Sequence, residues 1–200
     1  MNGHRAVFLD RDGVLNRVVE RDGKFASPRS LGDFEIVPGA AQAVRIIREK
    51  CRALVIVVTN QPDIERGKLD PKDLERMHDR LRREVPLDDL LVCPHGTDRC
   101  SCRKPKPGLL LEAAARWGID LADSFMVGDS EKDIGAGRNA GCRTVVIRTS
   151  YNAQTTAEGT RSGLRKWLSA PCAQTTTADH EAADLMQAVE AMMAQWEKKS

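Results

Sequence analysis

The stretch AVFLDRDGVLN, residues 6–16, joins four apolar residues directly to two carboxylates. A short continuous apolar run is typical of a strand buried on both faces of a parallel sheet. Asp10 and Asp12 follow this run with one residue between them. We therefore predict a buried strand over 6–9 that carries two acidic side chains at its carboxyl end. The spacing also predicts that Arg11 points away from the side to which both carboxylates turn.

The composition is that of a globular protein. The chain has 200 residues, of which 41% are hydrophobic and 30% charged, and this length predicts a single domain over 1–200. The formal net charge of +2 and the 4% aromatic content argue against nucleic acid or membrane partners. The first residues lack the long apolar core of a signal peptide. We therefore expect a cytoplasmic protein, and we expect it to be a monomer.

Four further apolar runs predict the rest of the sheet, at residues 53–58, 90–93, 124–127 and 144–147. Helical spacing of apolar residues predicts helices over 39–50, 70–85, 107–119 and 180–199. The alternation of strands and helices predicts a doubly wound α/β fold with a parallel sheet. We expect no separate cap domain, and we expect the segment 150–178, which is rich in Thr and Ser, to be irregular.

Polar or acidic residues follow three of the predicted strands. Asp10 and Asp12 follow the first, residues 59–61 (Thr-Asn-Gln) the second, and Asp129 the fourth, with Asp133 one turn later. Ligands bind at the carboxyl ends of parallel strands. Clustered carboxylates raise one another's pKa, and a hard cation such as Mg²⁺ relieves that repulsion. An aspartate can also attack phosphorus while a second one moves the proton. The alternative is an acidic surface rim.

Four segments resemble the ordered motifs of the haloacid dehalogenase-like (HAD) phosphatases. They are DRDGVL at 10–15, VTNQ at 58–61, RKPKPG at 103–108 and GDSEKDIGAG at 128–137. The resemblance spans nearly the whole chain. It implies a Rossmann-like core and Mg²⁺-dependent hydrolysis of a phosphomonoester through an aspartyl-phosphate.

The same resemblance implies which residues carry the reaction. Asp10 would be the nucleophile and Asp12 the general acid and base. The implied residues that bind the phosphate are Thr59, Asn60, Gln61 and Lys104. The implied Mg²⁺ site consists of Asp10, the backbone carbonyl of Asp12 and Asp129, with Asp133 supporting it from behind the direct ligands.

The segment CPHGTDRCSC, residues 93–102, gathers four residues that can bind a metal. Cys93, His95, Cys100 and Cys102 form a Cys₃His set, which suits a closed tetrahedral zinc site with a structural role. The alternative is a group of reactive or buried thiols. Because the segment ends just before Lys104, bound zinc would fix the position of that lysine. The remaining cysteines, expected to be ordinary thiols, are Cys51, Cys142 and Cys172.

A zinc loop directly before RKP resembles the branch of the family that contains heptose 1,7-bisphosphate 7-phosphatases and histidinol-phosphate phosphatases. The resemblance implies a small phosphorylated metabolite as the partner. The C7 phosphate of D-glycero-D-manno-heptose 1,7-bisphosphate is the leading substrate and histidinol phosphate the alternative. A function of a different class, an inactive zinc-stabilised binding module, is disfavoured because the motif residues are intact.

The chain departs from the heptose branch where the substrate would be recognised. The loop over residues 16–30 lacks a Gly-Tyr pair, Pro62 replaces a common serine, and Ser130 replaces a common lysine. Arg103 and then Arg66 are the predicted ligands of a second phosphate, since a planar guanidinium suits phosphate. The histidines predicted to lie on the surface are His4, His78 and His180.

Overall fold

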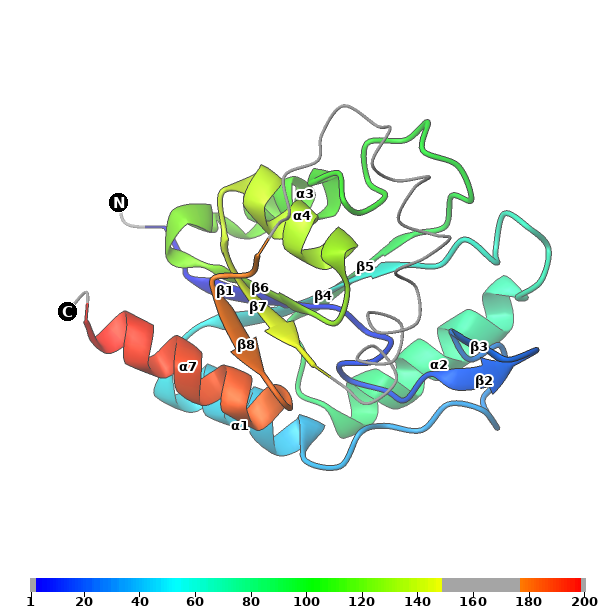
Figure 1. Cartoon of the computed structure of the whole chain (residues 1–200), viewed down its shortest axis with the longest axis horizontal. Coiled ribbons are helices and arrows are strands. Elements are labelled where there is room, and N and C mark those ends of the chain that lie inside the picture. The colour runs from blue at the N-terminus through cyan, green and yellow to red at the C-terminus, as the bar shows by residue number, and fades with distance from the viewer. Residues whose placement is uncertain (1–2, 149–176, 199–200) are drawn as a thin grey trace.

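The computed structural model describes residues 3–148 and 177–198. Six strands form one parallel sheet in the spatial order β5-β4-β1-β6-β7-β8 (Figure 1). Their bounds are β1 Ala6–Leu9, β4 Leu54–Asn60, β5 Asp89–Cys93, β6 Phe125–Gly128, β7 Arg143–Ile147 and β8 His180–Ala182. Since β1 lies between β4 and β6, the residues that follow these three strands meet at one edge of the sheet.

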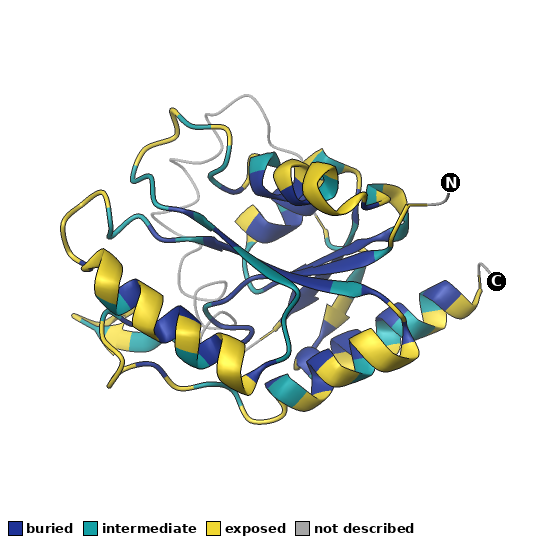
Figure 2. Ribbon diagram, turned by 180° about the vertical axis from the view of Figure 1, so that it is seen from behind, coloured by how far each residue is buried: buried dark blue, intermediate teal, exposed yellow. Residues whose placement is uncertain are grey.

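Helices cover both faces of the sheet. On one face lie α1 Ala40–Lys50, α2 Pro71–Glu84 and α7 Leu185–Glu197; on the other lie α3 Gly108–Trp117 and α4 Glu131–Ala140 (Figures 1 and 2). A short 3₁₀ helix, η1 Leu121–Asp123, precedes β6. Successive side chains of β1 alternate between the two layers, because Val7 and Leu9 pack with α1 and α7 while Ala6 and Phe8 pack with α3. This arrangement is the doubly wound α/β fold that the sequence predicts.

A hairpin that is absent from the predicted elements follows β1. Its strands are β2 Val19–Arg21 and β3 Lys24–Ala26, and they pair antiparallel around Asp22 and Gly23. Both turn residues have positive φ, 52° and 69°, as a two-residue turn of type I′ requires. The Asp-Gly pair between two short β-prone runs is the sequence signal for this hairpin.

The predicted helix over 180–199 is wrong at its start. His180–Ala182 instead forms β8, which pairs in parallel with β7 at the edge of the sheet. The helix α7 begins only at Leu185, where the side chain of Asp184 caps it by accepting a hydrogen bond from the backbone N–H of Gln187 at 2.8 Å. Most of the segment predicted to be irregular, 150–178, lies outside the described residues, as does Cys172.

Within the two described ranges, no helix has both the length and the apolar character that a membrane crossing requires.

Candidate active site

The carboxyl ends of the three central strands bring the predicted catalytic residues together. Asp10 follows β1, Thr59 and Asn60 end β4, and Asp129 follows β6. The backbone N–H of Asp10 donates to the carbonyl of Val127 at 2.9 Å, which continues the pairing of β1 with β6 by one residue. The backbone of the first aspartate is therefore held by the sheet itself.

Lys104 reaches this edge from the loop before α3 and is nearly inaccessible, with 2% exposure. Its Nζ lies 2.6 Å from Oδ1 of Asp10 and 2.5 Å from Oδ1 of Asp133, and it donates to the carbonyl of Val58 at 2.8 Å. Burial alone would lower the pKa of Lys104, but the two carboxylates outweigh it and raise the pKa above its ordinary value. Lys104 is thus a permanent positive charge beside Asp10.

Three carboxylates, two of which bind this lysine, lie close together at the ends of the strands. One oxygen from each of Asp10, Asp129 and Asp133 lies within 4.8 Å of the others. Burial raises the pKa of Asp10 well above its usual range; Lys104 opposes this shift, and the neighbouring carboxylates reinforce it. Such a group of hard oxygen donors fits a divalent cation like Mg²⁺, which would relieve the repulsion. The Asp12 carboxylate does not belong to this group of three.

The first turn of α4 orients Asp133. The backbone N–H and the hydroxyl of Ser130 both donate to Oδ2 of Asp133, at 3.1 and 2.5 Å, in a capping box. Gly128 is required here, because a Cβ at that position would lie 2.2 Å from the Cβ of Asp133. Oδ2 of Asp133 therefore accepts the hydrogen bonds at the start of the helix, while Oδ1 binds the ammonium of Lys104.

The Asn60 side chain binds the backbone of Lys104. Its Oδ1 accepts from the N–H of Lys104 at 3.1 Å, and its Nδ2 donates to the carbonyl of Lys104 at 3.2 Å. The side-chain amide thus lies against the loop that carries the lysine and positions Lys104. The contact of Asn60 with phosphate stays a prediction.

Asp12, which is partly exposed, is bound by a separate set of buried polar side chains. Arg11 does not point away from the carboxylates, so that prediction is wrong: its guanidinium folds back and binds Asp12 at 2.9 to 3.1 Å. Asn16 donates to Oδ1 of Asp12 at 2.9 Å and Gln61 to Oδ2 at 2.8 Å. Burial would raise the pKa of Asp12, but the charge of Arg11 and the hydrogen bonds from Asn16, Ser27 and Gln61 outweigh it and lower the pKa.

His78 is not on the surface as predicted. It is 1% exposed, and its Nε2 lies 3.0 Å from Nη1 of Arg11. Burial, followed by the charges of Arg11 and Arg82, lowers the pKa of His78 to about 3. Helical spacing was the missed signal, because His78 stands four residues after Leu74 and shares the buried face of α2.

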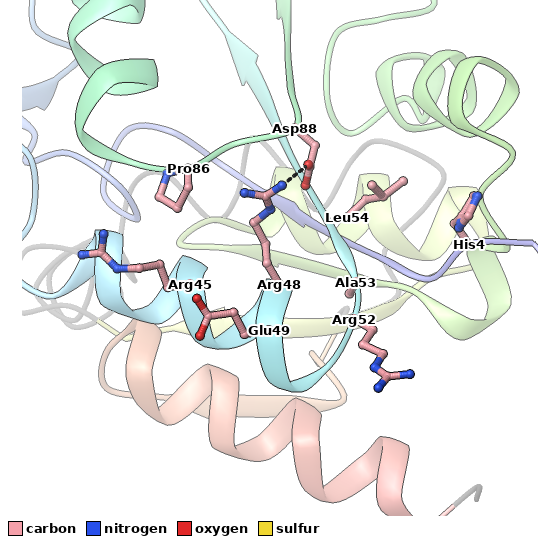
Figure 3. Close-up of a pocket in the computed structure, with 9 residues that line it drawn as sticks. All are labelled: His4, Arg45, Arg48, Glu49, Arg52, Ala53, Leu54, Pro86 and Asp88. Atoms are coloured by element: carbon pink, nitrogen blue, oxygen red, sulfur yellow. Dashed lines mark hydrogen bonds and ion pairs between the residues drawn. The ribbon is translucent and has the colours of Figure 1, made fainter.

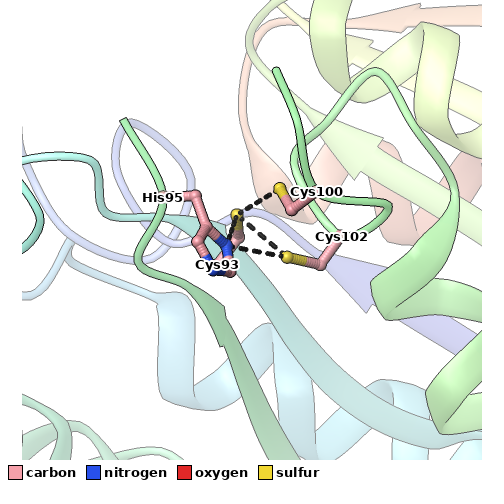
Figure 4. Close-up of side chains that lie close together, drawn as sticks. All are labelled: Cys93, His95, Cys100 and Cys102. Carbon is pink, nitrogen blue, oxygen red and sulfur yellow. Dashed lines mark hydrogen bonds between the residues drawn. The ribbon is translucent and has the colours of Figure 1, made fainter. Parts of the chain in front are cut away.

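The four predicted zinc ligands lie together at the end of β5 (Figure 4). Sγ of Cys93 lies 3.2 Å from Sγ of Cys102 and 3.7 Å from that of Cys100, and Nδ1 of His95 lies 3.3 Å from Sγ of Cys102. Zn–S bonds of about 2.3 Å imply tetrahedron edges of about 3.8 Å, so a zinc ion fits between these atoms with little movement. Burial and the neighbouring thiols raise the pKa of Cys102 to about 12, a conflict that a cation would remove.

Comparisons with known proteins identify relatives of this chain. A HAD-hydrolase-like family model matches residues 101–165. The D-glycero-β-D-manno-heptose-1,7-bisphosphate 7-phosphatase of Bordetella bronchiseptica is 35% identical over 161 residues, 78% of this chain and 87% of that protein. The enzyme of the same name from Pseudomonas aeruginosa is 37% identical over 157 residues, 74% of this chain and 84% of that protein.

The chain belongs to the HAD phosphatase family.

A solved structure supports the same conclusion. The crystal structure of D,D-heptose 1,7-bisphosphate phosphatase from B. bronchiseptica, complexed with magnesium and phosphate, superimposes with a TM-score of 0.75 and 30% identity. The match covers 96% of this chain and 99% of that one. The predicted HAD fold is therefore confirmed.

In this HAD phosphatase, the two arginines predicted to bind a second phosphate already have acidic partners. Arg103 donates to the carbonyl of His95 at 2.8 Å and lies 3.3 Å from Asp98. Arg66 lies 3.4 Å from Asp63, which also binds Arg29 at 2.7 Å. A second phosphate would have to compete with these carboxylates for either guanidinium.

A hollow at the amino ends of the strands, opposite the candidate active site, is a poor candidate for the phosphatase site (Figure 3). It lies beside α1 and the start of β4, and its charged lining includes Arg45, Arg48, Glu49 and Asp88. Asp88 is occupied, since it pairs with Arg48 at 2.9 Å and accepts from the backbone N–H of Val55 at 2.8 Å. None of the predicted catalytic residues lines it, and ligands of parallel sheets bind at the other ends of the strands.

Proposed function

We propose that this chain is a Mg²⁺-dependent phosphomonoesterase that releases the 7-phosphate of D-glycero-D-manno-heptose 1,7-bisphosphate. One observation carries the chemistry: Lys104 places its ammonium 2.6 Å from Asp10 within a group of three carboxylates. A nucleophilic carboxylate, a fixed cation and a set of oxygen ligands at one sheet edge are what phosphoryl transfer requires. The relatives named above support the choice of sugar substrate.

In the proposed reaction Asp10 attacks phosphorus. A bond forms between its carboxylate oxygen and phosphorus while the bond from phosphorus to the sugar oxygen breaks, and Asp12 delivers its proton to the departing oxygen. Asp12 then removes a proton from water, whose oxygen attacks the phosphorus of the aspartyl-phosphate and releases inorganic phosphate and Asp10. Lys104 neutralises charge near the nucleophile in both steps.

The two aspartates have different surroundings that suit their different roles. Asp10 faces Lys104 and the other carboxylates, whereas the Asp12 carboxylate is gripped by Arg11, Asn16 and Gln61. Arg11 favours the ionised form of Asp12, which is the form that activates water. A bound phosphate dianion beside Asp12 acts in the opposite direction and favours the protonated form that serves the leaving oxygen.

Two metal sites complete the proposal. Asp10, Asp129 and the backbone carbonyl of Asp12 would hold Mg²⁺, with Asp133 supporting them; the metal supplies charge stabilisation to the phosphoryl group. Cys93, His95, Cys100 and Cys102 would hold a structural zinc ion. The zinc loop leads into Lys104, and Asn60 binds the backbone of the same lysine from β4, so bound zinc and Asn60 would anchor this backbone from two directions.

A substrate panel tests the proposal. It contains heptose 1,7-bisphosphate, other sugar phosphates, histidinol phosphate and p-nitrophenyl phosphate, ranked by kcat/KM with Mg²⁺ present. We expect heptose bisphosphate to rank first; a higher rank for histidinol phosphate would reassign the substrate but keep the chemistry. Asp10→Asn should lose activity on every member of the panel. An inactive wild-type protein that still binds zinc would instead support the binding module.

A further inference from the structure

A chain of three side chains leads from the proposed active site into the interior. Asp12 is bound by Nε and Nη2 of Arg11, and Nη1 of the same guanidinium meets Nε2 of His78 at 3.0 Å. Arg11 is completely buried and His78 is 1% exposed. The segments involved are distant in the sequence, since 67 residues separate Arg11 from His78. A buried arginine with partners on both edges is held in one orientation.

The chemistry of the contact fixes the state of His78. A guanidinium has only N–H donors, so Nε2 of His78 must be the acceptor and the ring proton must lie on Nδ1. A protonated ring would place two cations against each other in the interior. The strongly lowered pKa of His78 agrees with a neutral ring. The neutral ring therefore accepts a hydrogen bond from Arg11, while Asp12 remains the anion that pairs with the positive charge of Arg11.

Arg11 also lies over the ring of Phe34, but this contact does not fix its orientation. The guanidinium carbon lies 5.6 Å from the centroid of the Phe34 ring, an attraction that tolerates rotation in the ring plane. Among the residues that the structure describes, two groups fix the guanidinium within its own plane: the carboxylate of Asp12 on one edge and the ring nitrogen of His78 on the other. Removing the His78 acceptor takes away the partner of Nη1, so we expect the guanidinium to turn within that plane.

We propose that His78 is a positioning residue for proton transfer: by accepting a hydrogen bond from Arg11, it holds the guanidinium edge that orients the Asp12 carboxyl toward the leaving oxygen. This inference rests on the proposed function, because it assigns His78 a role in that same reaction. His78 does not touch the reacting atoms. Its effect reaches them through Arg11 and Asp12.

The inference predicts a dependence on the leaving group that a purely structural role would not produce. A sugar alkoxide is a poor leaving group and needs the proton from Asp12, whereas p-nitrophenolate departs without one. The parameter kcat/KM covers only the steps up to formation of the aspartyl-phosphate, where the two substrates differ. A misoriented Asp12 therefore lowers kcat/KM for the sugar phosphate and largely spares the aryl phosphate.

Three variants of the full chain test this. His78→Leu removes the acceptor, His78→Gln keeps an acceptor at a similar reach, and Leu74→Ala weakens the packing of the same buried face of α2 as a control. The substrates are p-nitrophenyl phosphate and the best primary alkyl phosphate of the panel. We expect His78→Leu to lower the alkyl kcat/KM by about tenfold or more, while the aryl value changes by less than about threefold. His78→Gln should restore most of the loss, and Leu74→Ala should leave the ratio unchanged.

Two results would overturn the inference while leaving the phosphatase intact: equal losses on both substrates in His78→Leu, or no rescue by His78→Gln. Should His78→Leu fail to fold, His78→Asn replaces it, since the shorter amide cannot reach Nη1 of Arg11, and the same expectations apply. A wild-type protein that hydrolyses neither substrate would instead refute the proposed function, and the inference with it.

Discussion

Asn60 holds Lys104 through two hydrogen bonds, one to the N–H and one to the carbonyl of its backbone, at 3.1 and 3.2 Å. The amide at the end of β4 thereby locks the loop that follows the zinc ligands. The lysine needs this anchor, because its Nζ must meet Asp10 and Asp133 at hydrogen-bond distance. The position of the Lys104 ammonium thus depends on Asn60, whose side chain binds the lysine backbone.

Replacing this amide should reduce activity by displacing Lys104. Asn60→Ala removes both hydrogen bonds, which we expect to cost about 1–3 kcal/mol of unfolding free energy and to lower kcat/KM by about tenfold or more. Urea unfolding and steady-state kinetics measure the two effects. Asn139→Ala is the matched control, because it removes a single hydrogen bond to the neighbouring carbonyl of Pro105, and it should change kcat/KM little. Equal kinetic effects of the two variants would contradict the positioning role.

The ion pairs of Lys104 predict that its removal destabilises the metal-free protein. Lys104→Met leaves Asp10 and Asp133 buried without their cation, a loss of about 3–5 kcal/mol in the free energy of unfolding. Divalent cations should recover part of this, because they neutralise the same carboxylates. Thermal unfolding of the variant without and with added Mg²⁺, in the absence of a chelator that would also remove zinc, makes the comparison. The variant should be inactive in both. A Tm that does not respond to Mg²⁺ would argue against a cation at these aspartates.

His78 predicts a loss of stability in mild acid. Its pKa falls from the ordinary 6.5 to about 3 on folding, so between these values the unfolded chain binds a proton that the folded chain does not. The contribution of His78 is therefore complete above pH 6.5 and is lost as the pH falls toward 3. From about pH 7 to about pH 5 it amounts to roughly 2 kcal/mol.

The variant His78→Gln isolates this contribution, because glutamine does not titrate. Urea unfolding at a series of pH values should give His78→Gln a flatter decline of the unfolding free energy than the wild type below pH 6.5. Parallel curves for the two proteins would show that the buried ring takes up its proton without cost in the folded state.

The cysteine group predicts one zinc ion per chain. Metal analysis of the purified protein should find about one equivalent, and Cys100→Ser should lose it and lower the Tm. Activity should fall as well, since the loop leads into Lys104. Cys51→Ala is the control, because Cys51 is a buried thiol in the other hydrophobic layer. A wild-type protein without zinc and with freely titrating thiols would rule out the site.

The sequence by itself determined most of the strands and helices. It also determined that the site residues gather at the carboxyl ends of the strands. The apolar runs identified five of the six strands of the sheet, and a parallel sheet necessarily gathers the residues that follow β1, β4 and β6. The zinc ligands were equally readable, because all four lie within residues 93–102. Local spacing is sufficient wherever the partners are close in the chain or are ordered by strand periodicity.

Only the tertiary structure decided how the polar side chains pair. Arg11 is buried, so its guanidinium must find partners inside the protein. One edge binds Asp12, and the other donates a hydrogen bond to His78, which lies on a helix 67 residues further along the chain. Residues 180–182 form β8 because they can pair with the edge of β7 that lies opposite β6. Their sequence alone reads as the start of the helix that follows. These pairings follow from burial, because a charged group removed from water needs partners among the side chains that the fold brings near. The partners are distant in the sequence, so no periodic pattern predicts them.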